Sequence, residues 1–178
     1  MTVHRGYRRG LFGLITLALA LLFGTSDLSP GLSIGARAAQ EEPFQACFIE
    51  LAPRTDESDT SRVLAENCFD DPESAADFSV NLHARDSVYV IFTIWEHANF
   101  GGSSYEWYST SGCSGDYGYD DFNVIGWNDR AGSARSACGR TVNLWEHTYQ
   151  MGASLLINGY HSSLGVMNDQ SSSWDTVN

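Results

Sequence analysis

Two short patterns each occur twice in the second half of the chain, in the same order. The segment WEHANFGG at 95–102 is echoed by WEHTYQMG at 145–152, and NDRAGS at 128–133 is echoed by NDQSSS at 168–173. The first pair is offset by 50 residues and the second by 40, so the first copy carries an insertion. A paired motif repeated at this distance predicts two similar units that bury their faces against each other.

The residues around these motifs are typical of short β-strands joined by turns. The run VYVIFTIW at 88–95 is β-branched and aromatic, which predicts a buried strand. Gly, Asn and Asp then recur at turn positions about every eight to twelve residues. This rhythm predicts an all-β sandwich, with motif one at 88–138 and motif two at 139–178.

The first 38 residues have the pattern of a secretory signal peptide. Three arginines within the first nine residues are followed by an apolar run of 14 residues at 11–24. That run is shorter than the roughly 20 residues that a helix needs to cross a bilayer. The sequence ARA at 36–38 predicts cleavage before Ala39. We therefore expect a secreted, extracellular protein without a membrane anchor after cleavage.

The chain beyond residue 38 is strongly acidic. It has six arginines and no lysine against 21 acidic residues. Such a charge repels nucleic-acid phosphates and anionic lipids, which argues against nucleic-acid or membrane binding, and it favours a soluble monomer. We predict an acidic N-terminal extension at 39–87, either α/β or irregular, in which Asp71-Pro72-Glu73 begins a helix.

Four cysteines, Cys47, Cys68, Cys113 and Cys138, lie in this acidic part. An even number in an exported chain predicts two disulfide bonds, and the sequence alone permits three pairings. We favour Cys47–Cys68 and Cys113–Cys138, because each pair closes a short loop within one region. The chain has no Cys-x-x-Cys pair, so the cysteines do not indicate a zinc or redox site.

The repeated WEH segments resemble a signature of the βγ-crystallin superfamily, aromatic-x-x-x-x-aromatic-x-Gly. In motif one, Trp95, Phe100 and Gly102 match it. In this hairpin the second ring covers the first, and the glycine takes a backbone conformation that is costly for other residues. The resemblance implies a double Greek-key βγ-crystallin-like sandwich over residues 88–178.

Motif two matches the hairpin signature less completely. Trp145 and Gly152 occupy the first aromatic position and the glycine position, but Gln150 replaces the second aromatic residue. We therefore expect Tyr149 or Met151 to cover Trp145, and this hairpin to be less regular.

The second family signature, Asn/Asp-Asn/Asp-x-x-Ser/Thr-Ser, binds calcium. Residues 168–173 match it at every specified position, and residues 128–133 match it except at Gly132. Calcium is a hard cation that takes 6–8 oxygen ligands, and such turns offer carboxylate, hydroxyl and carbonyl oxygens. The resemblance therefore implies Ca²⁺ as the cofactor, bound at two sites between the motifs.

The resemblance also implies that each calcium site draws ligands from both motifs. The ligands of the first site would be the Glu146 and Gln170 carbonyls, the Ser172 hydroxyl and the Asp129 carboxylate. The ligands of the second would be the Glu96 and Arg130 carbonyls and the Asp169 carboxylate, with water in place of the hydroxyl that Gly132 lacks. We predict unequal sites, of which the Ser172 site is the tighter. Turn-stabilising roles fall to Asn128, Asn168, Ser133 and Ser173.

Two classes of function follow from this resemblance. The first is a secreted, non-catalytic calcium-binding protein. The second is a secreted inhibitor of extracellular metallopeptidases, because small disulfide-linked inhibitors share this fold, and the insertion Thr110–Asp121 near Cys113 is the candidate inhibitory loop. We expect no enzyme and no catalytic residues, because the sequence contains no convergent acid, base and nucleophile. The expected partner is calcium for the first class of function and a peptidase for the second.

Overall fold

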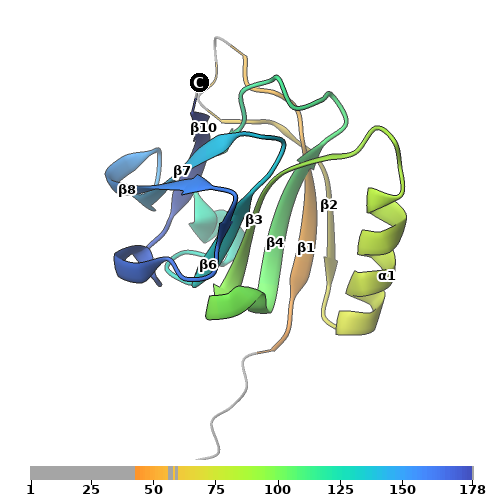
Figure 1. The fold of residues 1–178 in the computed structure, drawn as a ribbon, viewed down its shortest axis with the longest axis horizontal. Coiled ribbons are helices and arrows are strands. Elements are labelled where there is room, and N and C mark those ends of the chain that lie inside the picture. Colours follow the sequence, from red (N-terminus) through yellow and green to blue (C-terminus); the bar gives the residue numbers. More distant parts are fainter. Residues whose placement is uncertain (1–42, 56–57, 59, 178) are drawn as a thin grey trace, which may run out of the picture. The chain divides into compact units, whose positions relative to one another are not determined.

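The computed structural model describes residues 43–55, 58 and 60–177, and Figure 1 shows its fold. The predicted signal peptide and its cleavage position lie outside the described residues. Among the described residues, no helix combines the length and the apolar character needed to cross a bilayer.

The described strands form two sheets. The six-stranded sheet contains, in spatial order, β2 (Val63–Phe69), β1 (Ala46–Leu51), β4 (Gly101–Ser109), β3 (Tyr89–His97), β6 (Ser133–Ser136) and β9 (Tyr160–His161). The four-stranded sheet contains β5 (Gly118–Tyr119), β10 (Ser173–Val177), β7 (Thr141–His147) and β8 (Met151–Asn158). Short 3₁₀ turns, η1 (Ala98–Phe100), η2 (Phe122–Ile125) and η3 (Gly165–Met167), join them.

The two motifs exchange one strand each. Strands β3, β4 and β6 of motif one lie in the six-stranded sheet, whereas its short β5 pairs with β10 of motif two. In return, β9 of motif two leaves β7, β8 and β10 and pairs with β6 of motif one. This exchange makes a double Greek key, and the predicted all-β sandwich is confirmed.

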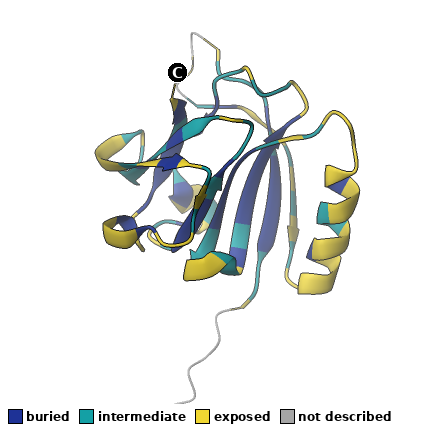
Figure 2. Cartoon of the chain, in the orientation of Figure 1, coloured by how far each residue is buried: buried dark blue, intermediate teal, exposed yellow. Residues whose placement is uncertain are grey.

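An aromatic core lies between the two sheets, where Figure 2 shows buried strand segments. Trp107 on β4 is fully buried and stacks on Phe92 of β3, with ring centroids 5.9 Å apart, and on Phe122 of η2 at 5.7 Å. It also meets Trp174 of β10 edge to face at 5.4 Å. Because these rings come from both motifs and both sheets, burial of this cluster holds the motifs together.

The acidic N-terminal segment extends the six-stranded sheet. Strand β1 pairs in parallel with β4 and antiparallel with β2. Residues Cys47 and Cys68 lie opposite each other on β1 and β2 and are joined by a disulfide bond. Residues 43–87 therefore contain both strands and a helix, the α/β alternative for this segment.

The helix α1 (Pro72–His83) begins where the sequence predicts. Asp71 is its N-cap, and its carboxylate accepts a hydrogen bond from the Ser74 backbone N–H at 2.7 Å. Proline at the first helical position costs no hydrogen bond there. Ala75, Phe78 and Leu82 pack onto a second apolar cluster that includes Phe48 of β1. The helix thus covers the outer face of the added strands (Figure 1).

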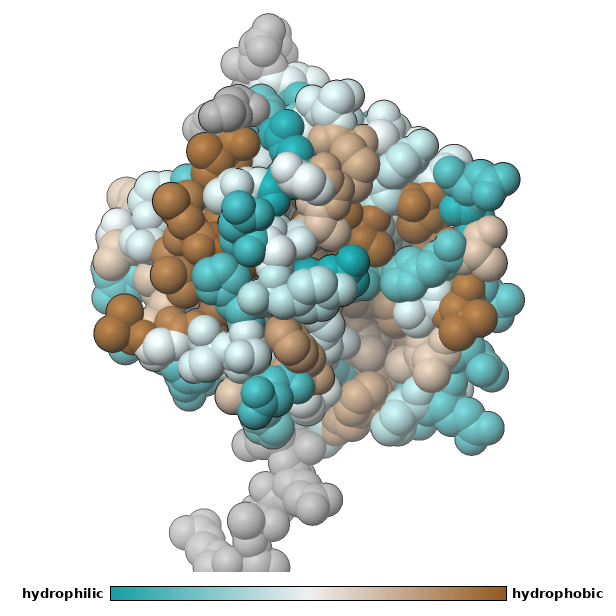
Figure 3. Space-filling model, viewed as in Figure 1, coloured by the Kyte–Doolittle hydropathy of each residue, from teal (hydrophilic) through white to brown (hydrophobic). Residues whose placement is uncertain are grey.

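The surface away from these clusters carries both apolar and hydrophilic side chains. Single large apolar side chains are exposed, among them Val80 on α1 and Leu156 on β8. On the face seen in Figure 3, several brown hydrophobic residues lie together on the left, and others are scattered among pale and teal residues. Isolated exposed apolar side chains of this kind are ordinary in folded proteins.

The insertion Thr110–Asp121 packs against the body of the molecule. Cys113 forms a disulfide bond with Cys138, so both bonds are the favoured pairings. The fully buried Tyr117 donates a hydrogen bond from its hydroxyl to the Gly112 carbonyl at 2.7 Å. In this segment only Thr110, Ser111 and Ser114 are exposed. A loop held down in this way offers little extended chain to a protease cleft.

A buried carboxylate anchors α1 to the sheet. Nε2 of His83 lies 2.6 Å from Oε1 of Glu106, a buried residue on β4. The hydrogen bond to Glu106 raises the pKa of His83 despite the opposing effects of partial burial and of Arg135. Because the folded pKa is raised, the stabilisation is complete below the unfolded pKa of about 6.5 and is lost as pH rises through the folded pKa.

The variant His83→Gln should therefore lose stability mainly at acidic pH. We expect the difference in free energy of unfolding between wild type and this variant to be larger at about pH 5.5 than at about pH 9. Urea unfolding of both proteins at the two pH values measures it. A difference that is the same at both values would show that protonated His83 does not stabilise the docked helix.

Candidate metal sites between the two motifs

The two hairpins have the same backbone conformation. At Asn99, Phe100 and Gly102 the φ angles are 58°, 63° and 78°. At the equivalent residues Tyr149, Gln150 and Gly152 they are 58°, 54° and 81°. The expectation of a less regular second hairpin is therefore wrong.

The side chains over the two tryptophans differ. Phe100 covers Trp95 edge to face, with ring centroids 5.2 Å apart, as the signature predicts. In motif two, Tyr149 and Met151 are 63% and 55% exposed, and among the described residues no ring contact joins Tyr149 to Trp145. The amide of Gln150 instead donates a hydrogen bond to the Asp120 carboxylate at 2.6 Å.

One buried serine holds each hairpin to its Asn-Asp turn, which explains why hairpin two stays regular. The Ser133 hydroxyl donates to the His97 carbonyl at 2.6 Å and accepts from the Phe100 N–H at 3.0 Å. The Ser173 hydroxyl makes the equivalent bonds to His147, at 2.6 Å, and from Gln150, at 3.1 Å. These bonds need only backbone atoms of the hairpin, so they do not depend on a second aromatic ring.

The two Asn-Asp turns are joined reciprocally. The Asp129 N–H donates to the Ser171 carbonyl, and the Asp169 N–H donates to the Ala131 carbonyl, both at 3.0 Å. Both aspartates have positive φ angles, of 57° and 54°. In each turn the asparagine amide donates to the neighbouring aspartate, at 2.7 Å from Asn128 and 2.6 Å from Asn168. Each aspartate is therefore held beside the turn of the other motif.

One hollow, which we call site two, brings together the ligand residues predicted for the tighter site. It is lined by Asn128, Asp129, Glu146, His147, Asp169, Gln170 and Ser172. The buried Ser172 hydroxyl donates to the Glu146 carbonyl at 2.7 Å. The oxygen-rich lining, with carboxylates from both motifs and no arginine, fits a hard divalent cation.

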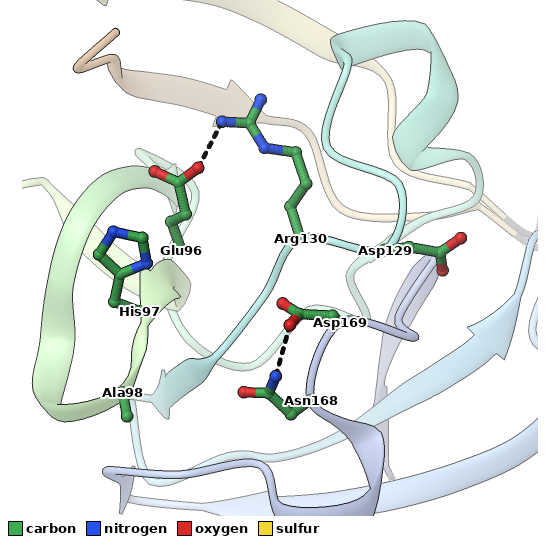
Figure 4. Close-up of a pocket in the computed structure, with 7 residues that line it drawn as sticks. All are labelled: Glu96, His97, Ala98, Asp129, Arg130, Asn168 and Asp169. Atoms are coloured by element: carbon green, nitrogen blue, oxygen red, sulfur yellow. Dashed lines mark hydrogen bonds and ion pairs between the residues drawn. The ribbon is translucent and has the colours of Figure 1, made fainter. Parts of the chain in front are cut away.

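The equivalent hollow, site one, is shown in Figure 4. It is lined by Glu96, His97, Ala98, Asp129, Arg130, Asn168 and Asp169. Here Nη2 of Arg130 donates to Oε1 of Glu96 at 2.7 Å. Burial alone would raise the pKa of Glu96, but hydrogen bonds from Arg130 and Ser103 outweigh it, and the pKa lies below its usual value. The structure thus also brings together Glu96, Arg130 and Asp169, the residues predicted for the weaker site.

In site one the hairpin backbone approaches Gly132, the residue that lacks the hydroxyl, very closely. A Cβ on Gly132 would lie 2.6 Å from the Glu96 carbonyl oxygen and 2.9 Å from the His97 carbonyl carbon. A serine at position 132 would therefore require the backbone of the hairpin to move.

The repeated Glu-His pair has a structural role that the sequence analysis did not assign. Oε2 of Glu96 accepts a hydrogen bond from the Ser103 N–H, and Oε2 of Glu146 accepts one from the Ala153 N–H, both at 3.2 Å. A Cβ on Gly102 would lie 2.9 Å from Cδ2 of His97. The side chains of the WEH segments thus fold back over the hairpin glycine, and their repetition is the sequence signal for this role.

One further group of possible ligands occurs among the described residues. Cys47, Glu66 and Cys68 lie close together on β1 and β2. The two sulfurs are joined in a disulfide bond, so neither is a thiolate that could bind a metal.

Comparison with known proteins yields solved structures only. No protein-family model and no curated protein matches the chain. Similar solved structures include a βγ-crystallin domain from Clostridium beijerinckii, a double mutant, with 23% identity, a TM-score of 0.41, and coverage of 48% of this chain and 94% of that one. A βγ-crystallin domain from Flavobacterium johnsoniae has 27% identity, a TM-score of 0.40, and coverage of 49% and 93%. A beta gamma crystallin from Ciona intestinalis has 22% identity, a TM-score of 0.40, and coverage of 48% and 98%.

The fold assignment stands on features of this chain itself. Strands β5 and β9 are exchanged between two motifs, each motif has the same glycine hairpin, and each hairpin is fastened by a serine to an Asn-Asp turn. The part of the chain from β3 to β10 has the fold of the βγ-crystallin superfamily.

Proposed function

We propose that this protein is a secreted, non-catalytic calcium-binding protein that binds its calcium ion at site two. The observation that carries the proposal is the pair of oxygens from Ser172 and Glu146, which lie 2.7 Å apart. Calcium ligands lie 2.3–2.6 Å from the ion, so two oxygens at this spacing can bind the same ion once the hydroxyl proton turns away.

The other two ligands would come from the facing turns. Gln170 precedes Ser172 by two residues and lines the same hollow, where its carbonyl would bind the ion. Asp129, held beside Ser171 by its backbone N–H, would supply a carboxylate from motif one. Such a bound ion would link the two motifs, and it would supply positive charge between their acidic turns.

The charges around site two favour a cation. Three carboxylate residues, Asp129, Glu146 and Asp169, line the hollow, and His147 is the one lining residue that protonation can make positive. Even a protonated histidine would be outnumbered by the three carboxylates, so the lining favours a cation. Export by residues 1–38, which we also propose, would deliver this site to a compartment outside the cell.

The variant Ser172→Ala tests the proposal. Removing the hydroxyl takes away one ligand of the ion, and we expect the calcium affinity to fall by about tenfold or more, which is about 1.4 kcal/mol. Isothermal titration of the oxidised full chain with calcium chloride measures the affinity. Magnesium should bind more weakly than calcium in both proteins, because it demands stricter octahedral geometry and gives up water reluctantly.

The neighbouring serine provides a matched control. The Ser171 hydroxyl is buried and has no hydrogen-bond partner among the described residues. Ser171→Ala removes the same atom from the next position and should leave the calcium affinity unchanged. Equal affinities in wild type and Ser172→Ala would disprove the ligand assignment, and an absence of any calcium binding to wild type would disprove the function.

A further inference from the structure

Motif one carries a fixed positive charge where motif two carries none. Arg130 occupies the position in its turn that Gln170 occupies in the other. Its guanidinium donates to the Glu96 carboxylate at 2.7 Å and to the Gly126 carbonyl at 3.1 Å. It also lies over the Trp127 ring, 5.3 Å from the ring centroid. Three partners therefore hold this side chain in place.

This guanidinium reduces the negative charge that a second metal ion would meet in site one. Arginine stays charged at any pH at which proteins are folded. The Glu96 side chain is only 11% exposed, so its ion pair with Arg130 is weakly screened by solvent. The pair neutralises the carboxylate whose counterpart in site two, Glu146, has no arginine partner in the lining, so site one offers a divalent cation one negative charge fewer than site two (Figure 4).

In motif one the backbone of the hairpin also lies close to the Asn-Asp turn. The hairpin approaches the turn so closely that the Glu96 carbonyl lies 2.6 Å from the position of a Cβ on Gly132. In motif two the Ser172 hydroxyl stands at nearly the same distance, 2.7 Å, from the Glu146 carbonyl. In motif one the backbone itself thus lies against the turn, and Arg130 and Glu96 join the turn to the hairpin.

We infer that Arg130 takes the place of a metal ion in site one. Its guanidinium ties the first turn to the first hairpin, so the chain binds one calcium ion and not two, and motif one keeps its geometry without calcium. This inference rests on the proposed function only for the ion at site two. The ion pair by which Arg130 holds the turn of motif one to its hairpin does not depend on calcium binding at site two.

Reciprocal variants test the inference, because each copies a residue of the other motif. Arg130→Gln removes the internal cation, and Gln170→Arg introduces one at the equivalent position of site two. We measure the number of calcium ions bound by isothermal titration of the oxidised full chain, and the midpoint of thermal unfolding in EGTA. Circular dichroism of each variant checks that the fold is kept.

The expected results differ for the two variants. Wild type should bind one ion, Arg130→Gln should bind two, and Gln170→Arg should bind none. In EGTA the unfolding midpoint should fall in Arg130→Gln, because the Glu96 ion pair is lost, and should not fall in Gln170→Arg. If Arg130→Gln does not fold, Gln170→Arg still decides, since unchanged calcium binding by that variant would overturn the inference.

The failures of the two proposals are distinguishable. Two ions bound by wild type, or one ion and an unchanged EGTA midpoint in Arg130→Gln, would overturn the role of Arg130 and leave calcium binding at site two intact. No ion bound by wild type together with one bound by Arg130→Gln would support the role of Arg130 and refute the proposed function.

Discussion

Replacing Gly132 with serine is expected to lower the free energy of unfolding by about 1–3 kcal/mol and to leave the number of bound calcium ions unchanged. On the sequence alone, this substitution completes the calcium signature of motif one. In the structure its Cβ would lie 2.6 Å from the Glu96 carbonyl oxygen and 3.0 Å from the Ala98 nitrogen. These are backbone atoms of the hairpin, so the hairpin itself has to move.

That movement would strain the hydrogen bonds that hold the Asn-Asp turn of motif one to its hairpin. The Gly132 N–H donates to the Trp95 carbonyl at 2.8 Å, and the neighbouring Ser133 hydroxyl donates to the His97 carbonyl at 2.6 Å. Both bonds join the turn to the hairpin that the new Cβ would displace. Lengthening bonds to buried polar groups is costly, because these groups have no water to replace their partners.

Gly101→Ser is the matched control for this prediction. Gly101 lies in the same hairpin, has an ordinary φ of −101°, and a Cβ there would find its nearest neighbours at 3.7 and 3.8 Å. Urea unfolding in EGTA compares the two variants with wild type. Equal stability of Gly132→Ser and Gly101→Ser, or a second calcium ion bound by Gly132→Ser, would contradict the closed geometry of site one.

The features that the sequence could predict are those that repeat or that act locally. The aromatic and glycine positions of the hairpins follow from the WEH repeat, and the Asp71 cap of α1 follows from its neighbours. The ligand residues could be grouped into two sites because the signature fixes their spacing along each turn. The structure collects the same groups in two hollows.

The features that the sequence could not predict depend on contacts between distant segments. Strand β1 pairs in parallel with β4, so Ala46 lies opposite Ser104, and no local pattern records that pairing. From the sequence alone, the acidic segment around it can be predicted only as an extension that is either α/β or irregular. The regular second hairpin was missed for a similar reason, because the bonds from Ser173 cross 26 residues of sequence to reach His147.

The close approach of the hairpin to Gly132 in site one also depends on contacts between distant segments, so the sequence could not predict it. In the sequence, Gly132 stands where the calcium signature has a serine or threonine, so the hydroxyl is missing, which suggests an open position for water. Whether that position is open depends on how near the hairpin at Glu96 approaches, and the spacing of residues along the chain does not encode this distance. The ion pair of Arg130 likewise joins residues 34 positions apart.

Calcium should stabilise the protein through Asp129, because this residue is the ligand that links motif one to the ion in site two. At a free calcium concentration about 100 times the dissociation constant, binding adds about 2.7 kcal/mol to the free energy of unfolding. Asp129→Asn removes the carboxylate charge from the shared site and should abolish most of this gain. Asp169→Asn makes the same change in the equivalent turn. Asp169 also lines site two, but it is not one of the four ligands proposed there, so this variant should keep most of the gain.

The most direct test of the account is thermal unfolding of wild type, Asp129→Asn and Asp169→Asn, each in calcium, in magnesium and in EGTA. We predict that calcium raises the unfolding midpoint of wild type and Asp169→Asn, that it leaves Asp129→Asn nearly unchanged, and that magnesium has a much smaller effect on all three. An unfolding midpoint of wild type that is the same in calcium and in EGTA, or an equal response of the two variants, would contradict calcium binding at site two.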